Sequence, residues 1–424
     1  MRVINYPDKK EWQKLLIRPV FETHSLDESV RKVLENVKKN GDEAILKYTE
    51  KFDHIRLDSY IVSKEEKVAA LKLVDTELKK AMELASDNIA KFHNAQKSSI
   101  VEVETLPGVR CWQKAVPIEK IGLYIPGGTA PLFSTVLMLG IPAKIAGCKE
   151  IVLCSPPGKD GFLNPAIIYA ASIAGIDKMY KIGGMQAIGA MAYGTDTIPA
   201  VYKIFGPGNQ YVTAAKQMVA REGMAIDMPA GPSEVAVLAD ESSNPVFIAS
   251  DLLSQAEHGT DSQVVMITVS KEIADQTIKE LESQLNELPR KNLAEKSLAY
   301  GKIFLVKDYE EMMELANTYA PEHLIISTSN ADSLVEKVIN AGSVFIGAYT
   351  PESAGDYASG TNHTLPTNGY AVAYSGVNLD AYFKKITFQH INKEGLELLG
   401  PAIEKMALAE ELTAHQSEQL RLRH

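Results

Sequence analysis

The chain has 424 residues, of which 45% are hydrophobic and 23% are charged, a balance typical of a globular protein with a buried core. Its 54 acidic and 44 basic residues give a net charge of −10 at pH 7, which argues against nucleic acid or an anionic membrane as a partner. Its apolar runs are far shorter than the ~18 residues that span a bilayer, and its charged N-terminus is unlike a signal peptide. Three scattered cysteines are too few for a disulfide framework, so we expect a protein of the reducing cytoplasm.

The first hundred residues are predicted to be mainly helical. Ser25-Leu-Asp-Glu28 has the pattern of a capping box and precedes an amphipathic stretch that runs to about Gly41. Ser63-Lys-Glu-Glu66 repeats the pattern before a second helix. The alternating segment 101–112, broken by a Pro-Gly pair, predicts a β-hairpin.

From residue 118 onward, short apolar runs alternate with helical segments. The predicted strands lie within 121–125, 150–154, 179–182, 201–205, 235–238, 264–269, 302–306, 324–327 and 343–346. This alternation is typical of parallel sheets covered by helices, so we expect an α/β protein with two doubly wound, Rossmann-like parallel-sheet domains. The last forty-odd residues are predicted to be a charged helical tail without a strand, and a second subunit is a candidate to cover it.

Four glycine-containing loops lie beside the predicted strands, at 126–129, 183–186, 206–209 and 230–234. Three of them lead into helices, where glycine lets a phosphate approach the backbone N–H groups of a helix N-terminus. Each loop is also compatible with an ordinary tight turn, and the standard dinucleotide and P-loop signatures are absent from the sequence. Together the loops indicate a nucleotide.

Candidate metal ligands are scattered along the chain. Gln255-Ala-Glu-His258 ends a predicted helix with Gly259 as its C-cap, and its first and last residues share a face. Asp356 lies in another glycine-containing loop. These donors suit Zn²⁺, Mn²⁺ or Co²⁺, although a histidine at a helix end can also be a simple cap and Asp356 an ordinary turn residue.

Glu322 and His323 are candidate acid–base residues at the start of a predicted strand. Neighbours on a strand point to different sides, so one could reach a substrate proton and the other a water. The pKa of histidine near ~6.5 and a carboxylate raised by burial suit general-base chemistry. The alternative is a pair without a catalytic role.

Several of these segments resemble the histidinol dehydrogenase family. The resemblance rests on Gly122-Leu-Tyr-Ile-Pro-Gly-Gly, Gly206-Pro-Gly-Asn, Ala225-Ile-Asp-Met-Pro-Ala-Gly-Pro-Ser-Glu-Val, Ser254-Gln-Ala-Glu-His-Gly, Ala320-Pro-Glu-His-Leu, Ser359-Gly-Thr-Asn-His and Leu412-Thr-Ala-His. These blocks follow the family's order and cover nearly the whole chain. The resemblance implies an NAD-dependent homodimer with one Zn²⁺ per subunit, which oxidises L-histidinol to L-histidine through L-histidinaldehyde at the end of histidine biosynthesis.

The resemblance also implies roles for individual residues. Glu322 and His323 match the catalytic bases, and Tyr124, Gln186 and Asn209 match contacts to NAD. The zinc ligands match Gln255, His258, Asp356 and His415, the last from the partner subunit. Further substrate contacts match Ser233, His363 and Glu410, beside His323 and the four zinc ligands.

The family's architecture implies a domain division. It places an N-terminal helical segment at 1–20, a split catalytic domain at 21–123 plus 233–377, an inserted NAD-contacting domain at 124–232, and a helical tail at 378–424 that is exchanged with the partner subunit.

Glu410 and His415 are five residues apart, so on a continuous helix of ~3.6 residues per turn their side chains would point about 140° away from each other. They could not easily serve one ligand from such a helix. Thr413-Ala-His-Gln416 has the pattern of a capping box, so we predict a break near Leu412–Thr413.

Three other functions are compatible with parts of the sequence. A zinc-dependent hydrolase would use the same His, Asp and Gln site with water activated by Glu322, but it needs no nucleotide loops. A serine hydrolase would place Ser233 in Gly-x-Ser-x-Gly, yet the sequence Gly231-Pro-Ser-Glu-Val lacks the second glycine. A non-catalytic nucleotide-binding protein would leave Glu322 and His323 without a role.

Overall fold

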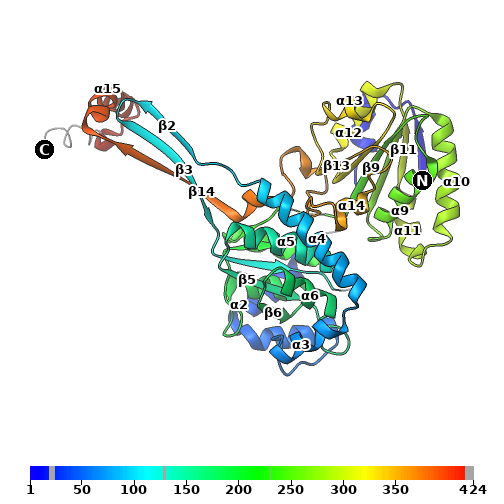
Figure 1. Cartoon of the computed structure of the whole chain (residues 1–424), viewed down its shortest axis with the longest axis horizontal. Helices are drawn as coiled ribbons and strands as arrows, with labels where there is room; N and C mark the ends of the chain where they lie inside the picture. Colours follow the sequence, from blue (N-terminus) through cyan, green and yellow to red (C-terminus); the bar gives the residue numbers. More distant parts are fainter. Residues whose placement is uncertain (19–23, 128–129, 230, 416–424) are drawn as a thin grey trace.

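The structure is a computed structural model, and it describes residues 1–18, 24–127, 130–229 and 231–415. Two parallel sheets with helices on both faces form the body, and a long antiparallel ribbon projects from it (Figure 1). The predicted α/β fold with two parallel sheets is confirmed. Among the described residues, no helix is both long and apolar enough to cross a membrane.

The first sheet has six parallel strands in the order β1-β11-β10-β9-β12-β13. Its strands are β1 Arg2–Asn5, β9 Glu234–Ala239, β10 Gln263–Thr268, β11 Lys302–Leu305, β12 His323–Ser327 and β13 Ser343–Ile346. One face packs against α9 Pro245–Ala256, α10 Lys271–Leu285 and α11 Lys291–Tyr300. The other face packs against α1 Trp12–Leu15, α12 Tyr309–Tyr319 and α13 Ala331–Val335. Burial on both faces explains why the inner strands are continuous apolar runs.

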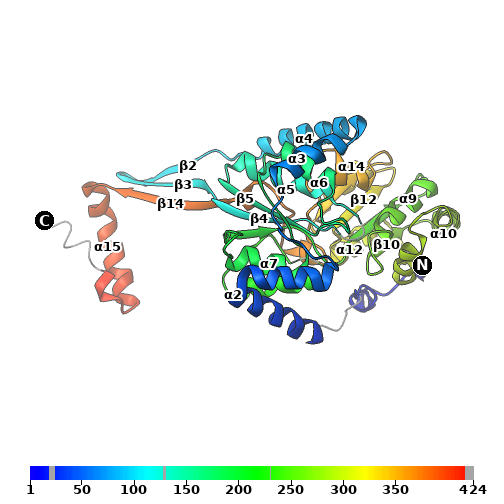
Figure 2. The ribbon, with the colours of Figure 1, turned by 90° about the horizontal axis from the view of Figure 1, so that it is seen from below.

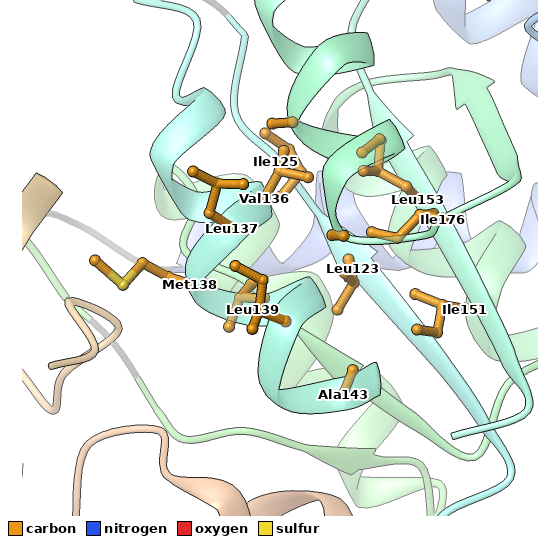
Figure 3. Packing of buried hydrophobic residues seen from close by; sticks show 14 of the residues in the cluster. Leu123, Ile125, Val136, Leu137, Met138, Leu139, Ala143, Ile151, Leu153 and Ile176 are labelled. Atoms are coloured by element: carbon orange, nitrogen blue, oxygen red, sulfur yellow. The ribbon is translucent and has the colours of Figure 1, made fainter. Parts of the chain in front are cut away.

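The second sheet has five parallel strands in the order β6-β5-β4-β7-β8. Its strands are β4 Lys120–Tyr124, β5 Glu150–Ser155, β6 Lys178–Lys181, β7 Lys203–Phe205 and β8 Ala225–Ile226. One face is covered by α3 Lys64–Leu73, α4 Thr76–Ala95, α5 Phe133–Ala146 and α6 Pro165–Ile173. The other is covered by α2 His24–Asp53, α7 Gly184–Tyr193 and α8 Gln210–Arg221 (Figure 2). The core beneath α5 is apolar throughout, with Val136 and Leu139 beside Leu123 and Ile125 (Figure 3).

The projecting part is called the arm here and comprises residues 101–117 and 383–415. Its ribbon has the strand order β14-β3-β2, with β2 Val101–Leu106, β3 Val109–Pro117 and β14 Phe383–Ile391. The predicted hairpin at 101–112 is confirmed as β2 and β3. Helix α15 Lys393–Ala409 lies at the tip of the ribbon, followed by the short η4 Thr413–His415 (Figure 1).

The two ends of the chain are less helical than predicted. The N-terminal segment contains β1, a short edge strand that pairs with β11 some 300 residues later. The C-terminal tail was predicted to hold no strand, and this is wrong, because β14 pairs with β3 along its whole length. Both strands are specified by distant partners rather than by a local pattern.

The predicted domain division differs from the packing of the helices. The division grouped 21–123 with the first sheet, but α2 packs on α7, α3 on α6 and α4 on α5, all around the second sheet. Strand β4 belongs to the second sheet as well. By packing, residues 24–95 therefore accompany the second sheet.

Of the two capping boxes predicted in the first hundred residues, one is confirmed. Ser63 accepts a hydrogen bond from the N–H of Glu66, whose side chain accepts from the N–H of Ser63. Helix α2 already includes Ser25, so the prediction of an N-cap there is wrong. The helix is kinked at Gly41, where φ is 49° and the predicted amphipathic pattern ends.

Candidate active site

Glu322 and His323 lie together at the amino end of β12, against the start of β9. The side chain of Glu322 accepts a hydrogen bond of 2.8 Å from the main-chain N–H of Glu234. Nδ1 of His323 lies 3.0 Å from the main-chain oxygen of the same residue, which assigns the ring proton to Nδ1. The prediction that the two side chains point to different sides is wrong, because both turn toward Glu234. Oε2 of Glu322 lies 3.6 Å from Nδ1 of His323.

The free ring nitrogen of His323 is the atom available for chemistry. Nε2 is buried and has no hydrogen-bond partner among the described residues, and it lies 3.5 Å from Oδ1 of Asp356. Burial lowers the pKa of His323, but the carboxylates of Glu322, Glu352 and Asp356 outweigh it and raise that pKa to about 10. Burial raises the pKa of Glu322 to about 8, so this carboxyl can hold or release a proton near neutral pH.

A second group of polar side chains adjoins His323. His258, Glu352 and Asp356 each offer one ligand atom, and these atoms all lie within 4.8 Å of one another. His258 follows α9, which ends at Ala256, so the predicted C-cap at Gly259 is not observed. Glu352 and Asp356 are one turn apart on α14 Glu352–Tyr357 and thus share a face.

Gln255 is buried beside this group and completes a set of donors that fits a divalent cation. With its amide nitrogen turned toward Glu352, it donates to both carboxylate oxygens, at 3.2 Å for Oε2. Its amide oxygen is then free for another partner. One imidazole, carboxylates and an amide oxygen without a thiolate suit zinc.

Of two further predicted substrate contacts, His363 borders the group and Ser233 precedes Glu234. His363 is partly buried, its Nδ1 lies 2.9 Å from the main-chain oxygen of Asp356, and its Nε2 lies 3.0 Å from the hydroxyl of Thr135. Thr135 belongs to α5, so this contact joins the loop after α14 to the helices of the second sheet. Ser233 directly precedes Glu234, and its main-chain oxygen accepts from Gln263 at 2.9 Å.

The arm holds the two remaining predicted substrate or metal contacts away from the others within one chain (Figure 1). Glu410 is the exposed C-cap of α15, and His415 is exposed at the end of η4. The predicted break between them is confirmed, because α15 ends at Ala409, Glu411 has a φ of 59° and η4 begins at Thr413. Gln416, the last residue of the predicted capping box there, lies outside the described residues.

The predicted nucleotide contacts lie at the carboxyl ends of strands in the second sheet. Tyr124 ends β4, and its hydroxyl accepts a hydrogen bond of 3.0 Å from the N–H of Gly184. Gln186 on α7 is fully buried, and neither amide atom has a partner among the described residues. Asn209 is exposed, and its side-chain oxygen caps α8 by accepting from Tyr211 and Val212. The two helix N-termini and the unpaired amide of Gln186 fit a nucleotide.

The loop after β7 approaches β4 so closely that only glycine fits. Gly206 has a φ of 123°, and a Cβ there would lie 2.0 Å from the main-chain oxygen of Tyr124. Buried Lys216 donates to the main-chain oxygen of Gly206 at 2.8 Å and to Asp227 at 2.5 Å. The side chain of Asp227 in turn accepts from the N–H of Gly206, which fixes this loop in place.

Comparison with known proteins agrees with the sequence resemblance. A sequence model of the family described as histidinol dehydrogenase matches residues 16–423. The histidinol dehydrogenase of Bacteroides thetaiotaomicron is 60% identical over 417 residues, which are 98% of this chain and 97% of the relative. That of Escherichia coli K12 is 50% identical over 411 residues, which are 96% of this chain and 94% of the relative. A crystal structure of histidinol dehydrogenase from Elizabethkingia anophelis has a TM-score of 0.97 at 54% identity, covering 100% of this chain and 98% of that one.

The chain belongs to the histidinol dehydrogenase family. It is therefore an oxidoreductase, and the resemblance stated from the sequence motifs is confirmed.

In this member of the histidinol dehydrogenase family, two residues lie at the site that the sequence analysis did not predict. Glu352 lies among the candidate metal ligands, and its spacing of four from Asp356 on a helix was a signal that could have found it. Glu234 contacts both candidate bases through its main chain, and only the register of β9 against β12 reveals this.

Proposed function

We propose that this enzyme oxidises L-histidinol to L-histidine with two molecules of NAD⁺, through L-histidinaldehyde, in the last steps of histidine biosynthesis. The observation that carries the proposal is the unpaired Nε2 of His323, buried beside Asp356 in a chain 50–60% identical to histidinol dehydrogenases. Each hydride transfer needs a base next to the reacting carbon, and the aldehyde step also needs an activated water.

His323 is proposed to start the reaction. Its Nδ1–H is held by the main-chain oxygen of Glu234, so its Nε2 would accept the alcohol proton as hydride passes to the first NAD⁺, provided that a bound cation replaces the imidazolium as the countercharge of the nearby carboxylates. The alcohol carbon loses two electrons and becomes the aldehyde.

Glu322 is proposed to act in the second oxidation. Its carboxylate takes a proton from water, whose oxygen adds to the aldehyde carbon and forms a hydrate. The hydrate forms as its oxyanion, which gives its hydride to a second NAD⁺ and its remaining hydroxyl proton to solvent, and this leaves the carboxylate of L-histidine. Because burial raises the pKa of Glu322 to about 8, the carboxyl is suited to exchanging a proton at cellular pH.

The residues near His323 are proposed to hold one Zn²⁺ per subunit. Gln255, His258 and Asp356 would bind it in one subunit together with His415 of the partner subunit. When bound, the ion would supply a Lewis acid that holds the amine and imidazole of the substrate. Ser233 and His363 would contact the substrate from the same chain, and Glu410 of the partner subunit would complete the site.

The nucleotide is proposed to bind at the carboxyl edge of the second sheet. Gln186 would use its unpaired amide for NAD⁺, beside Tyr124 and the loop at Asn209. The contact of Thr135 with His363 joins this half of the molecule to Asp356, which lies beside His323.

A homodimer with exchanged arms would bring the remaining residues into place. The arm exposes large apolar side chains, among them Leu398, Met406 and Leu408, with exposures of 52%, 65% and 57%. Such a surface on a thin projection is typical of a protein interface. We also propose a cytoplasmic location, which suits the three free cysteines.

A direct assay tests the proposed function. Purified protein is incubated with L-histidinol and NAD⁺, and NADH is followed by its ultraviolet absorbance before and after removal of metal. We expect NADH only from the metal-loaded protein, with activity restored by Zn²⁺. Absence of NADH from fully metallated protein would contradict the proposal.

A further inference from the structure

Glu234 connects the two candidate bases to a part of the chain outside the site. Its main chain bonds to both bases, as described, and its side chain points instead to Arg18 in the N-terminal segment. Arg18 Nε donates to Oε1 at 2.5 Å and Nη2 donates to Oε2 at 2.8 Å. Oε1 also accepts from the N–H of Asn368 at 2.9 Å.

This ion pair is buried and geometrically fixed. The side chain of Glu234 is 1% exposed and that of Arg18 is 16% exposed. Two parallel hydrogen bonds between a guanidinium and a carboxylate set the plane of both groups, which a single ammonium contact does not.

Arg18 is itself held on its remaining sides. Nη2 donates to the main-chain oxygen of Tyr319 at 2.7 Å, and the guanidinium carbon lies 4.2 Å from the centre of the Tyr319 ring. Gly369 passes close to the same group, since a Cβ there would lie 3.2 Å from Nη1. The conformation of Arg18 is thus determined by α12 and by the loop at 368–369.

We propose that Arg18 is a positioning residue, which fixes Glu322 and His323 through the carboxylate and the main chain of Glu234. The inference rests on the proposed function, because it assigns an effect on the bases that act in that reaction. Arg18 reaches neither base directly, so its effect must pass through Glu234. A misplacement of about 1 Å at such a base can lower a rate by about 100-fold.

The test compares Arg18→Met, Arg18→Lys, Glu234→Gln and the double variant Arg18→Met/Glu234→Gln. For each protein, kcat, the KM for NAD⁺, the zinc content and the Tm are measured. We expect Arg18→Met to lower kcat by about tenfold or more while the KM for NAD⁺ and the zinc content stay unchanged. The kcat of Arg18→Lys should fall less, because lysine keeps the positive charge, although it cannot form the paired hydrogen bonds.

The double variant shows whether the kcat of Arg18→Met falls because the Glu234 carboxylate is left unpaired or only because a contact between Arg18 and Glu234 is lost. Arg18→Met leaves the Glu234 carboxylate buried and unpaired, and removing that charge as well should recover about threefold or more of the lost kcat. Lys9→Met serves as the matched control, because Lys9 pairs with Glu314 of α12 from the same N-terminal segment but on the surface. Its kcat should stay within about twofold of the wild type.

The outcomes distinguish the inference from the function on which it rests. If the wild type forms no NADH, the proposed function fails. If the wild type is active and Arg18→Met and Arg18→Lys lower only the Tm, with kcat per folded, zinc-loaded site unchanged, the pair is structural and the inference is overturned. Should Arg18→Met not fold, Arg18→Lys and Glu234→Gln decide between these two results.

Discussion

Nε2 of His323 lies 3.5 Å from Oδ1 of Asp356, so a predicted base and a predicted metal ligand belong to one buried cluster. Three carboxylates surround the imidazole, and together they raise the pKa of His323 to about 10 despite its burial. A cation bound to Asp356 would replace the imidazolium as the countercharge, which would free Nε2 to accept a proton. The geometry thus links the occupancy of the metal site to the base.

Glu322→Gln should separate the two oxidations. The amide cannot accept a proton from water, whereas the alcohol step is proposed to depend on His323. We expect the rate from L-histidinaldehyde to fall far more than the single-turnover rate from L-histidinol, by at least about tenfold more. Rapid-mixing measurements of NADH from each substrate check this. Equal losses in both steps would refute the division of roles.

Substitutions in the proposed metal cluster should weaken zinc binding to different extents. Asp356→Asn removes the charge of a proposed ligand and should weaken zinc binding by about 100-fold, whereas Glu352→Gln removes a partner of Gln255 and should weaken it by about tenfold. Competition with a chromogenic chelator gives both affinities. A larger loss from Glu352→Gln would make Glu352 the ligand in place of Gln255.

The proposed exchange of the arms predicts complementation between inactive subunits. His415→Ala and Asp356→Ala each remove one proposed ligand, and a mixed dimer would rebuild one intact site from Asp356 of one subunit and His415 of the partner subunit. After equimolar subunit exchange, about a quarter of the wild-type activity should return. Unmixed variants are the control. If no activity returns although mixed dimers are detected, each arm serves its own subunit.

Asp53→Asn should stabilise the protein in a pH-dependent way. Asp53 ends α2, where the helix dipole disfavours an anion, and its Oδ2 is buried without a partner among the described residues. Burial raises its pKa to about 6 from an unfolded value of 3.8, so ionisation destabilises the fold increasingly as pH rises from 3.8 through 6.

At pH 7.5 the asparagine variant should gain roughly 1–2 kcal/mol in free energy of unfolding, after allowance for partial exposure. The gain should shrink as pH falls through 6 toward 4. Urea denaturation in the absence of NAD⁺ at several pH values measures it, with Asp177→Asn as an exposed control. A gain that is constant with pH would contradict the account.

The sequence was sufficient to predict most of the two parallel sheets and the β2–β3 hairpin, but not the strand β14 that completes the ribbon of the arm. Buried strands such as β9 are continuous apolar runs, so a local pattern identifies them. Strand β14 is mostly exposed, and its partner β3 lies some 270 residues earlier, so nothing local marks it as a strand. The packing of α2 to α4 on the second sheet likewise depends on contacts between distant segments.

The sequence likewise predicted only part of the site. Motif resemblance predicted Glu322, His323, His258 and Asp356, and the structure brings these four together. The contribution of Glu234 depends on strand register, and that of Arg18 on a contact across 216 positions, so neither follows from a motif.

The number of NADH molecules formed per L-histidinol consumed tests the central claim most directly. Two NADH per L-histidinol, lost on chelation and restored by Zn²⁺, is the result that a four-electron oxidation predicts. One NADH per L-histidinol would mean that the enzyme stops at the aldehyde. Consumption of substrate by zinc-loaded protein without any NADH would contradict the account and favour a zinc-dependent hydrolase.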